Sequence, residues 1–339
     1  MWRHPRRTDF GGARKSSRAG DKIAGPRAET KLATAQTASV IAHGETHDTE
    51  ERPITKSQSA DEHGGWLPKA PSPTENPLMT VAFARAYEKA ATRITAPVSA
   101  AALERLGRID RDMQLLDIGA GTGALSIPAA HTGAHVTAID IAPGMVELLA
   151  DRLTPFPRAE VRLMDGQALE FADNSFDAAL SVVGVSIFPD WQRGLAEQVR
   201  VLRPGGTAVV ATWGTLPGGG PFMIMAEALR AVFPDAQPPA PPAGFLELSD
   251  PDVMVRRLAD AGLVDVTVDD IEAVWEGPSG PAYLAELGEF HPFIGPYAVL
   301  DDATRARLDE AILEAVDRQA HNGRVALKST VTLGMGTRP

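Results

Sequence analysis

The most informative segment of this chain reads Leu115-Leu116-Asp117-Ile118-Gly119-Ala120-Gly121-Thr122-Gly123. Its apolar first half predicts a buried strand, and its glycines predict a tight turn in which a ligand can approach the backbone without obstruction by a Cβ atom. A helical run follows at once. A glycine-rich turn between a strand and a helix lies at the carboxyl edge of a parallel sheet, where ligands bind. The segment therefore predicts a ligand site, but not yet which ligand, because it also satisfies the dinucleotide pattern G-x-G-x-x-G/A.

Short apolar runs and helical segments alternate on both sides of this turn. The predicted strands after the first one cover residues 136–139, 160–163, 176–182 and 207–212. This alternation indicates βαβ units and a parallel sheet. Before the turn, the segment from Val81 to Leu106 predicts two short helices separated at Pro97. After Trp213 the alternation stops, and further strand material lies at residues 264–268, 271–275 and 325–333.

Acidic residues follow the second and third predicted strands. Asp140 ends the second strand about 20 residues after the glycines, where a carboxylate can accept the hydroxyls of a ribose. That position suits either NAD or S-adenosylmethionine (SAM). Asp165-Gly166 follows the third strand, where a carboxylate can accept the amine of an adenine. The helix before the fifth strand stops at Arg203-Pro204-Gly205-Gly206.

Taken together, these motifs resemble the class I SAM-dependent methyltransferases, a broad group that includes ubiquinone and menaquinone biosynthesis methyltransferases. The matching segments are Leu116–Gly123, Ala138–Met145, Asp165-Gly166, Phe176-Asp177, Phe188–Asp190 and Arg200–Gly206. They cover about residues 110–215. The resemblance implies an α/β, Rossmann-like fold: a seven-stranded, mostly parallel sheet with helices on both faces and an antiparallel last strand. Beyond the part that the resemblance covers, we expect residues 214–260 and 280–324 to form a partly helical lid over the acceptor.

The resemblance also implies SAM as the cofactor. Asp117 would steer its ammonium group, and the turn would cradle its amino-acid part through Gly119, Ala120, Gly121, Thr122 and Gly123. Asp140 would bind the ribose and Ile141 would pack on the adenine. The remaining implied contacts are Asp165 and Gly166 at the adenine amine, and Ser181 and Val182 beneath the methionine portion.

Catalytic groups are less evident than the cofactor site. Methyl transfer from a sulfonium needs alignment and exclusion of water more than an acid–base pair, although an O- or N-acceptor can require a base. His291 and His321 fall in the predicted lid and are the candidate bases, although a packing or surface role is favoured for each of them. Tyr87 is a candidate to close over SAM, or a packing residue of its helix. The lid also holds apolar residues that would line a partly apolar acceptor pocket or simply fill a core: Trp213, Phe222, Met223, Met225, Phe290, Phe293 and Tyr297.

Composition limits the alternatives. The chain has 339 residues, a net charge of -11 and no cysteine. The acidic balance disfavours a nucleic-acid partner, and the absence of cysteine excludes disulfides and fits a reducing, cytoplasmic compartment. No apolar stretch is long enough to span a membrane, and no cluster has metal-ligand spacing. Residues 1–78 have the composition of a disordered extension, which leaves 79–339 as the methyltransferase domain.

Other functions share part of this pattern. An NAD-dependent oxidoreductase would use the same glycine turn, but it has no account of Asp165-Gly166 or of the Pro204-Gly205-Gly206 stop. A non-catalytic partner subunit would not need the intact glycines and acids. A methyltransferase acting on RNA is disfavoured by the acidic charge. The sequence therefore predicts a SAM-dependent methyltransferase for a small organic acceptor, without predicting the acceptor or the oligomeric state.

Overall fold

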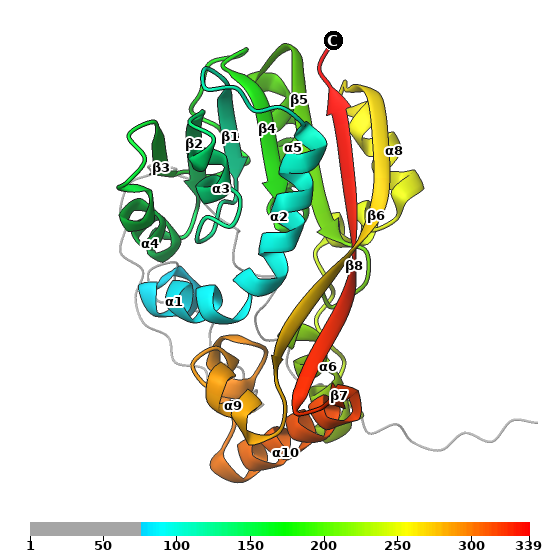
Figure 1. Cartoon of the computed structure of the whole chain (residues 1–339). Coiled ribbons are helices and arrows are strands. Elements are labelled where there is room, and N and C mark those ends of the chain that lie inside the picture. Colours follow the sequence, from blue (N-terminus) through cyan, green and yellow to red (C-terminus); the bar gives the residue numbers. More distant parts are fainter. Residues whose placement is uncertain (1–75) are drawn as a thin grey trace, which may run out of the picture. The chain divides into compact units, whose positions relative to one another are not determined.

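A β-sheet organises the part of the chain that the computed structural model describes, residues 76–339 (Figure 1). Its strand order is β3-β2-β1-β4-β5-β8-β6. The parallel strands are β1 (Gln114–Ile118), β2 (His135–Asp140), β3 (Ala159–Leu163), β4 (Phe176–Val182) and β5 (Leu202–Trp213). The last strand, β8 (Arg324–Thr337), lies antiparallel between β5 and β6 (Val264–Pro278). The predicted Rossmann-like fold is confirmed. A short eighth strand, β7 (Ala320–His321), pairs with β8 and was not expected.

Helices cover both faces of the sheet because successive strand residues point to opposite sides. Leu115 belongs to the core cluster under α2 (Thr92–Leu106), α3 (Ser126–His131) and α4 (Pro143–Leu153). Its neighbour Leu116 belongs to the opposite cluster, under α5 (Trp191–Val201), α7 (Ala243–Leu248) and α8 (Pro251–Asp260). β1 therefore has a helical layer on each side. The strand order reverses between β1 and β4, so the ligand crevice expected for this topology opens at the carboxyl end of β1.

The N-terminal helices break at a different residue from the one the sequence predicts. Pro77–Met79 forms a 3-10 turn, and α1 (Val81–Ala90) and α2 meet at Ala91, whereas Pro97 lies inside α2. The prediction of a break at Pro97 is wrong. The indole Nε1 of Trp275 donates to the carbonyl oxygen of Ala90 at 2.7 Å, so a distant side chain satisfies the end of α1 and the chain can turn there. The apolar face of α2, with Ile94 and Val98 buried on either side of the proline, stays packed on the sheet.

The two stretches of strand material at residues 264–268 and 271–275 form one continuous strand. The two polar residues between them do not end β6, because each has a partner. Asp269 forms an ion pair with Arg105 at 2.6 Å, and Asp270 accepts a hydrogen bond from the Thr332 hydroxyl at 2.9 Å. β6 is the edge strand of the sheet, and the exposed side chains of an edge strand are commonly charged.

β6 and β8 continue past the end of β5 as a long hairpin, which carries a cap (Figure 1). The cap consists of α6 (Pro221–Val232), α9 (Pro281–Leu287), α10 (Asp302–Gln319) and the 3-10 turns η3 (His291–Phe293) and η4 (Tyr297–Val299). The cap contains parts of both segments that were expected to form a lid, 214–260 and 280–324. α7 and α8 also belong to segment 214–260, but they pack on a face of the sheet and not in the cap. None of the helices within residues 76–339 is long and apolar enough to cross a membrane. The predicted extension lies outside the described residues, apart from residues 76–78.

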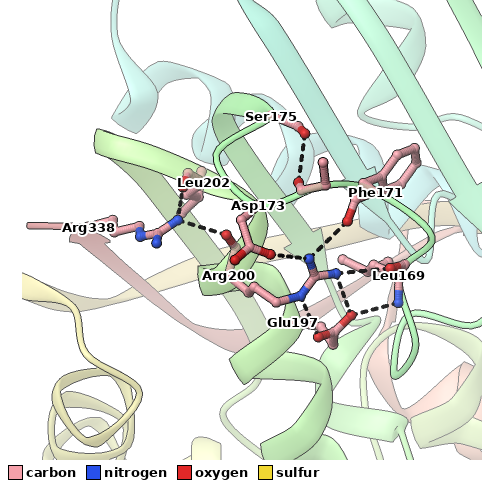
Figure 2. A network of polar contacts seen from close by, with 9 residues as sticks. Leu169, Phe171, Asp173, Ser175, Glu197, Arg200, Leu202 and Arg338 are labelled. Atoms are coloured by element: carbon pink, nitrogen blue, oxygen red, sulfur yellow. Dashed lines mark hydrogen bonds and ion pairs between the residues drawn. The ribbon is translucent and has the colours of Figure 1, made fainter.

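The amino ends of β4 and β5 are fastened by a polar network (Figure 2). The Arg200 guanidinium donates to the carbonyl oxygens of Leu169 and Phe171, each at 2.9 Å, and pairs with Glu197 and Asp173. Its hydrogen bond lowers the pKa of Glu197. Arg338, from the C-terminal end of the chain, donates to the carbonyl oxygen of Arg200 at 2.7 Å. The motif that begins at Arg200 therefore has a structural role at the edge of the sheet opposite the glycine turn.

Candidate cofactor site

The glycine turn after β1 uses conformations and close contacts that other residues do not tolerate. Gly119, Gly121 and Gly123 all have positive φ, at 74°, 54° and 96°. A Cβ atom on Gly119 would lie 3.0 Å from the Cα of Gly184, and one on Gly123 would lie 2.5 Å from the Leu149 side chain. Glycine is therefore required both for the turn and for its packing against the β4 and α4 segments.

Asp140, at the end of β2, holds the turn in place. Its carboxylate accepts a hydrogen bond from the backbone N–H of Gly121 at 2.8 Å and another from Ala142 at 2.9 Å. The N–H groups of Gly119 and Ala120 both donate to the carbonyl oxygen of Ile139. Burial raises the pKa of Asp140, and these backbone hydrogen bonds work in the opposite direction. The end of β2 thus fixes the turn and keeps a carboxylate directly behind it.

Asp117 is the most deeply buried acid of the site, with 2% of its surface exposed. The Ser126 hydroxyl donates to its carboxylate at 2.5 Å. Desolvation raises the pKa of Asp117 to about 7; the Ser126 hydrogen bond lowers it, and the charge of Asp140 raises it further. A buried carboxylate of this kind is stabilised in its charged form by a cation.

A small cavity lies between the glycine turn, the end of β4 and helices α1 and α2. Its volume is about 30 Å³. The lining residues include seven that the sequence analysis named, and they are Tyr87, Asp117, Gly119, Ala120, Gly121, Thr122 and Val182. The wall also contains residues that the sequence analysis did not single out, namely Thr95, Ser99, Ala124 and Leu125. No lysine or arginine is among the lining residues.

Tyr87 projects from α1 to the cavity, as expected for a residue that covers the site. Desolvation raises the pKa of its hydroxyl to about 12; the charge of Asp140 also raises it, and the Thr95 hydroxyl beside it lowers it. At neutral pH the group is therefore protonated and can donate a hydrogen bond.

Three other residues named from the sequence, Asp165, Gly166 and Ile141, do not line the cavity. Asp165 accepts hydrogen bonds from the backbone and side chain of Gln167, at 2.8 and 3.0 Å, and the neighbouring Met164 N–H donates to the carbonyl oxygen of Asp140. A Cβ atom on Gly166 would lie 2.6 Å from the Phe188 ring. Ile141 follows Asp140 and is half-buried.

Ser181 joins the end of β4 to the end of β1. Its hydroxyl donates to the carbonyl oxygen of Ile118 and accepts from the N–H of Val185, both at 2.9 Å. It therefore shapes the cavity floor from beneath, while Val182 reaches the cavity itself.

The candidate histidines are not brought to the cavity. His291 is buried in η3 beside Tyr283 and Tyr297, and burial lowers its pKa to about 4. His321 lies exposed on β7, at the far end of the β6–β8 hairpin. Neither lines the cavity, so the structure gives no geometric support to either as a base. Within the described residues, no group of three His, Asp or Glu residues is arranged to hold a metal ion.

Comparisons with known proteins show which family this chain resembles. Residues 116–210 match a family model described as "Methyltransferase domain". An uncharacterized protein of Mycobacterium tuberculosis is 34% identical over 160 residues, which are 47% of this chain and 57% of that protein. A demethylmenaquinone methyltransferase of Renibacterium salmoninarum is 34% identical over 164 residues, which are 45% of this chain and 68% of that enzyme.

The chain spans a little over half the length of the first curated relatives that it matches. A solved structure from an antibiotic biosynthesis pathway of Anabaena variabilis has a TM-score of 0.50 at 18% identity, covering 73% of this chain and 99% of that one, and it supports the fold. The family match begins at Leu116 and spans the glycine turn and the end of β4, which line the cavity, and also Asp140 and Asp165, which do not. The chain belongs to the class I SAM-dependent methyltransferases.

Proposed function

We propose that this protein transfers a methyl group from SAM to a small, partly apolar organic acceptor. The observation that carries the proposal is the buried carboxylate of Asp117 at a glycine-walled cavity that no lysine or arginine lines, with Asp140 holding the glycine turn. Burial raises the pKa of Asp117, so a positively charged ligand group beside it would stabilise its ionised form. SAM carries an ammonium and a sulfonium group and meets this requirement.

The residues of this chain fit the parts of SAM in the order that the family implies. Asp117 accepts hydrogen bonds from the ammonium group. Asp140 keeps acceptor capacity on each carboxylate oxygen after binding Gly121 and Ala142, and this capacity serves the ribose hydroxyls. Asp165, held by Gln167, would accept a hydrogen bond from the adenine amine. When bound, SAM supplies a methyl group on a positively charged sulfur.

The acceptor is expected between α1 and the cap, where aromatic rings gather. The rings of Phe83 and Phe293 lie 5.2 Å apart, those of Phe222 and Phe290 lie 5.5 Å apart, and Tyr87 lies 6.4 Å from Phe290. Such a wall binds an apolar ring or chain and excludes water, while the protonated Tyr87 hydroxyl can orient one polar atom. This supports alignment and desolvation as the main contributions of the protein to the rate.

The composition of the chain bears on its cellular compartment and on its partners. A net charge of -11 disfavours a nucleic-acid partner, and the sequence contains no cysteine. We therefore propose a cytoplasmic enzyme with a small-molecule substrate.

Titration calorimetry tests the cofactor first. We expect SAM and its product S-adenosylhomocysteine to bind at micromolar concentrations or tighter, and NAD not to bind. Micromolar binding of NAD without binding of SAM would overturn the proposal in favour of an oxidoreductase. Incubation with methyl-labelled SAM and a metabolite extract then identifies the acceptor, with demethylmenaquinone as a defined first trial because several relatives are demethylmenaquinone methyltransferases.

A further inference from the structure

One face of α2 carries a row of hydroxyl groups opposite the glycine turn. Thr92, Thr95 and Ser99 are spaced i, i+3 and i+7, which places them on the same side of the helix. The Thr92 hydroxyl lies 3.2 Å from that of Thr122 in the turn. Thr95 and Ser99 both line the cavity. α2 therefore forms a polar wall of the cavity, in addition to packing on the sheet.

Ser99 is the unusual member of this row. It is fully buried, with 0% of its surface exposed, and its Oγ atom has no hydrogen-bond partner. A buried hydroxyl without a partner destabilises a protein by about 1–3 kcal/mol, so such groups are rare and call for an explanation. Thr95 is only weakly satisfied: its hydroxyl reaches two backbone carbonyls of α2 at 3.4 and 3.5 Å. Both hydroxyls can still donate into the cavity.

The charges around the cavity indicate which kind of ligand group these two hydroxyls can bind. The wall contains the Asp117 carboxylate but no lysine or arginine. Arg152 has its own partners, because it donates to the carbonyl oxygen of Thr122 at 2.6 Å and pairs with Glu88 at 2.7 Å. A ligand group with negative charge would therefore depend on neutral donors. Among the hydroxyls of α2 that line the cavity, Ser99 has no partner and Thr95 has only long contacts.

We propose that Ser99 and Thr95 bind the carboxylate of the methionine part of SAM. Each hydroxyl donates a hydrogen bond to a carboxylate oxygen, while Asp117 accepts from the ammonium group of the same amino acid. The two ends of the zwitterion thus meet complementary groups on opposite walls. The inference rests on the proposed function, since it assigns residues to one part of the proposed ligand. It predicts that the site distinguishes ligands by the presence of that carboxylate.

Three ligands and three variants test the proposal by titration calorimetry. S-adenosylhomocysteine carries the carboxylate, decarboxylated SAM lacks it, and methylthioadenosine lacks the whole amino-acid end. For Ser99→Ala and Thr95→Val, we expect the affinity for S-adenosylhomocysteine to fall about 10- to 100-fold, as for loss of a hydrogen bond to a charged group. The affinities for the other two ligands should stay within about twofold of wild type.

Ser186→Ala is the matched control. Ser186 is also fully buried with an unpartnered hydroxyl, but it does not line the cavity. This variant should bind all three ligands as the wild type does. Without ligand, Ser99→Ala should keep or raise the melting temperature, by about 2–4 °C per kcal/mol, because an unsatisfied buried group is removed.

Two results would overturn the inference, and they differ from failure of the proposed function. One is an unchanged affinity of both variants for S-adenosylhomocysteine. The other is an equal loss of affinity for all three ligands, which would show a purely structural role for α2. Wild-type protein that binds none of the ligands would instead overturn the proposed function, and the inference with it.

Discussion

At the scale of single residues, the carboxyl group of Asp117 links pH to folding. Its pKa is raised to about 7 in the folded protein, mainly by desolvation, from an ordinary value of 3.8. The folded state therefore binds a proton more tightly than the unfolded state. This contribution to stability is complete below the unfolded pKa and is lost as the pH rises through the folded pKa.

Asp117→Asn tests this link, because asparagine keeps the shape of the protonated acid but does not ionise. Between pH 5 and pH 8, the wild type without ligand should lose about 2–3 kcal/mol of unfolding free energy through Asp117. The unfolding free energy of the variant should lack this part of the dependence on pH. Urea unfolding at a series of pH values measures both proteins, and parallel pH profiles would contradict the prediction. Asp140, whose pKa is also raised, still titrates in the variant.

The residues of the candidate site differ in how far the sequence could predict them. The glycines and Asp117, Asp140 and Asp165 lie within or directly after strands, so a local motif was enough to place them at one edge of the sheet. Thr95 and Ser99 were missed because their common face depends on α2 being continuous through Pro97. The histidines were named from chain position alone, and cap packing rather than sequence decides where they lie.

At the scale of elements, the junction of α1 and α2 depends on a side chain far along the sequence. Trp275 of β6 donates its indole N–H to the carbonyl oxygen of Ala90, a contact between residues 185 positions apart. Local propensity predicted that the two helices are separated at Pro97. A local sequence pattern cannot predict the contact between Trp275 and Ala90, because the two residues are far apart in the sequence. The parallel strands were predictable because their apolar runs are local, whereas the helix junction is determined by tertiary contact.

Trp275→Phe should destabilise this junction, and Trp191→Phe is its matched control. Both tryptophans are buried and both have an arginine over the ring, Arg93 in one case and Arg257 in the other. The indole N–H of Trp191 has no partner, so only Trp275→Phe removes a hydrogen bond. The unfolding free energy should therefore fall about 1–3 kcal/mol more for Trp275→Phe, measured by urea denaturation. Equal losses in both variants would show that the hydrogen bond has no net effect on stability.

At the scale of the described molecule, residues 76–339, α1 and α2 form a cover that contacts both the cofactor site and the cap. Glu88 pairs with Arg152 of α4 at 2.7 Å, while Lys89 and Arg93 pair with Glu289 and Glu286 of the α9 region. These pairs are partly exposed and individually weak. The cavity beneath the cover, at about 30 Å³, is far smaller than the roughly 300 Å³ or more of a ligand pocket. We therefore expect ligand exchange to require movement of α1 and the first turns of α2 while the sheet stays in place.

Hydrogen exchange followed by mass spectrometry tests whether the cover moves while the sheet stays in place. Without ligand, the amides of α1 should exchange faster than those of β1 and β4, because only one face of α1 is buried while close packing on both faces holds the strands. Saturating S-adenosylhomocysteine should slow exchange in α1, in the first turns of α2 and in α9, and leave β1 and β4 nearly unchanged. The control segment is β7, which lies at the far end of the hairpin and should not respond. Uniform slowing across the sheet and the cover would show that the ligand stabilises the domain as one unit; protection of the strands with no change in α1 would show that the ligand enters by another route.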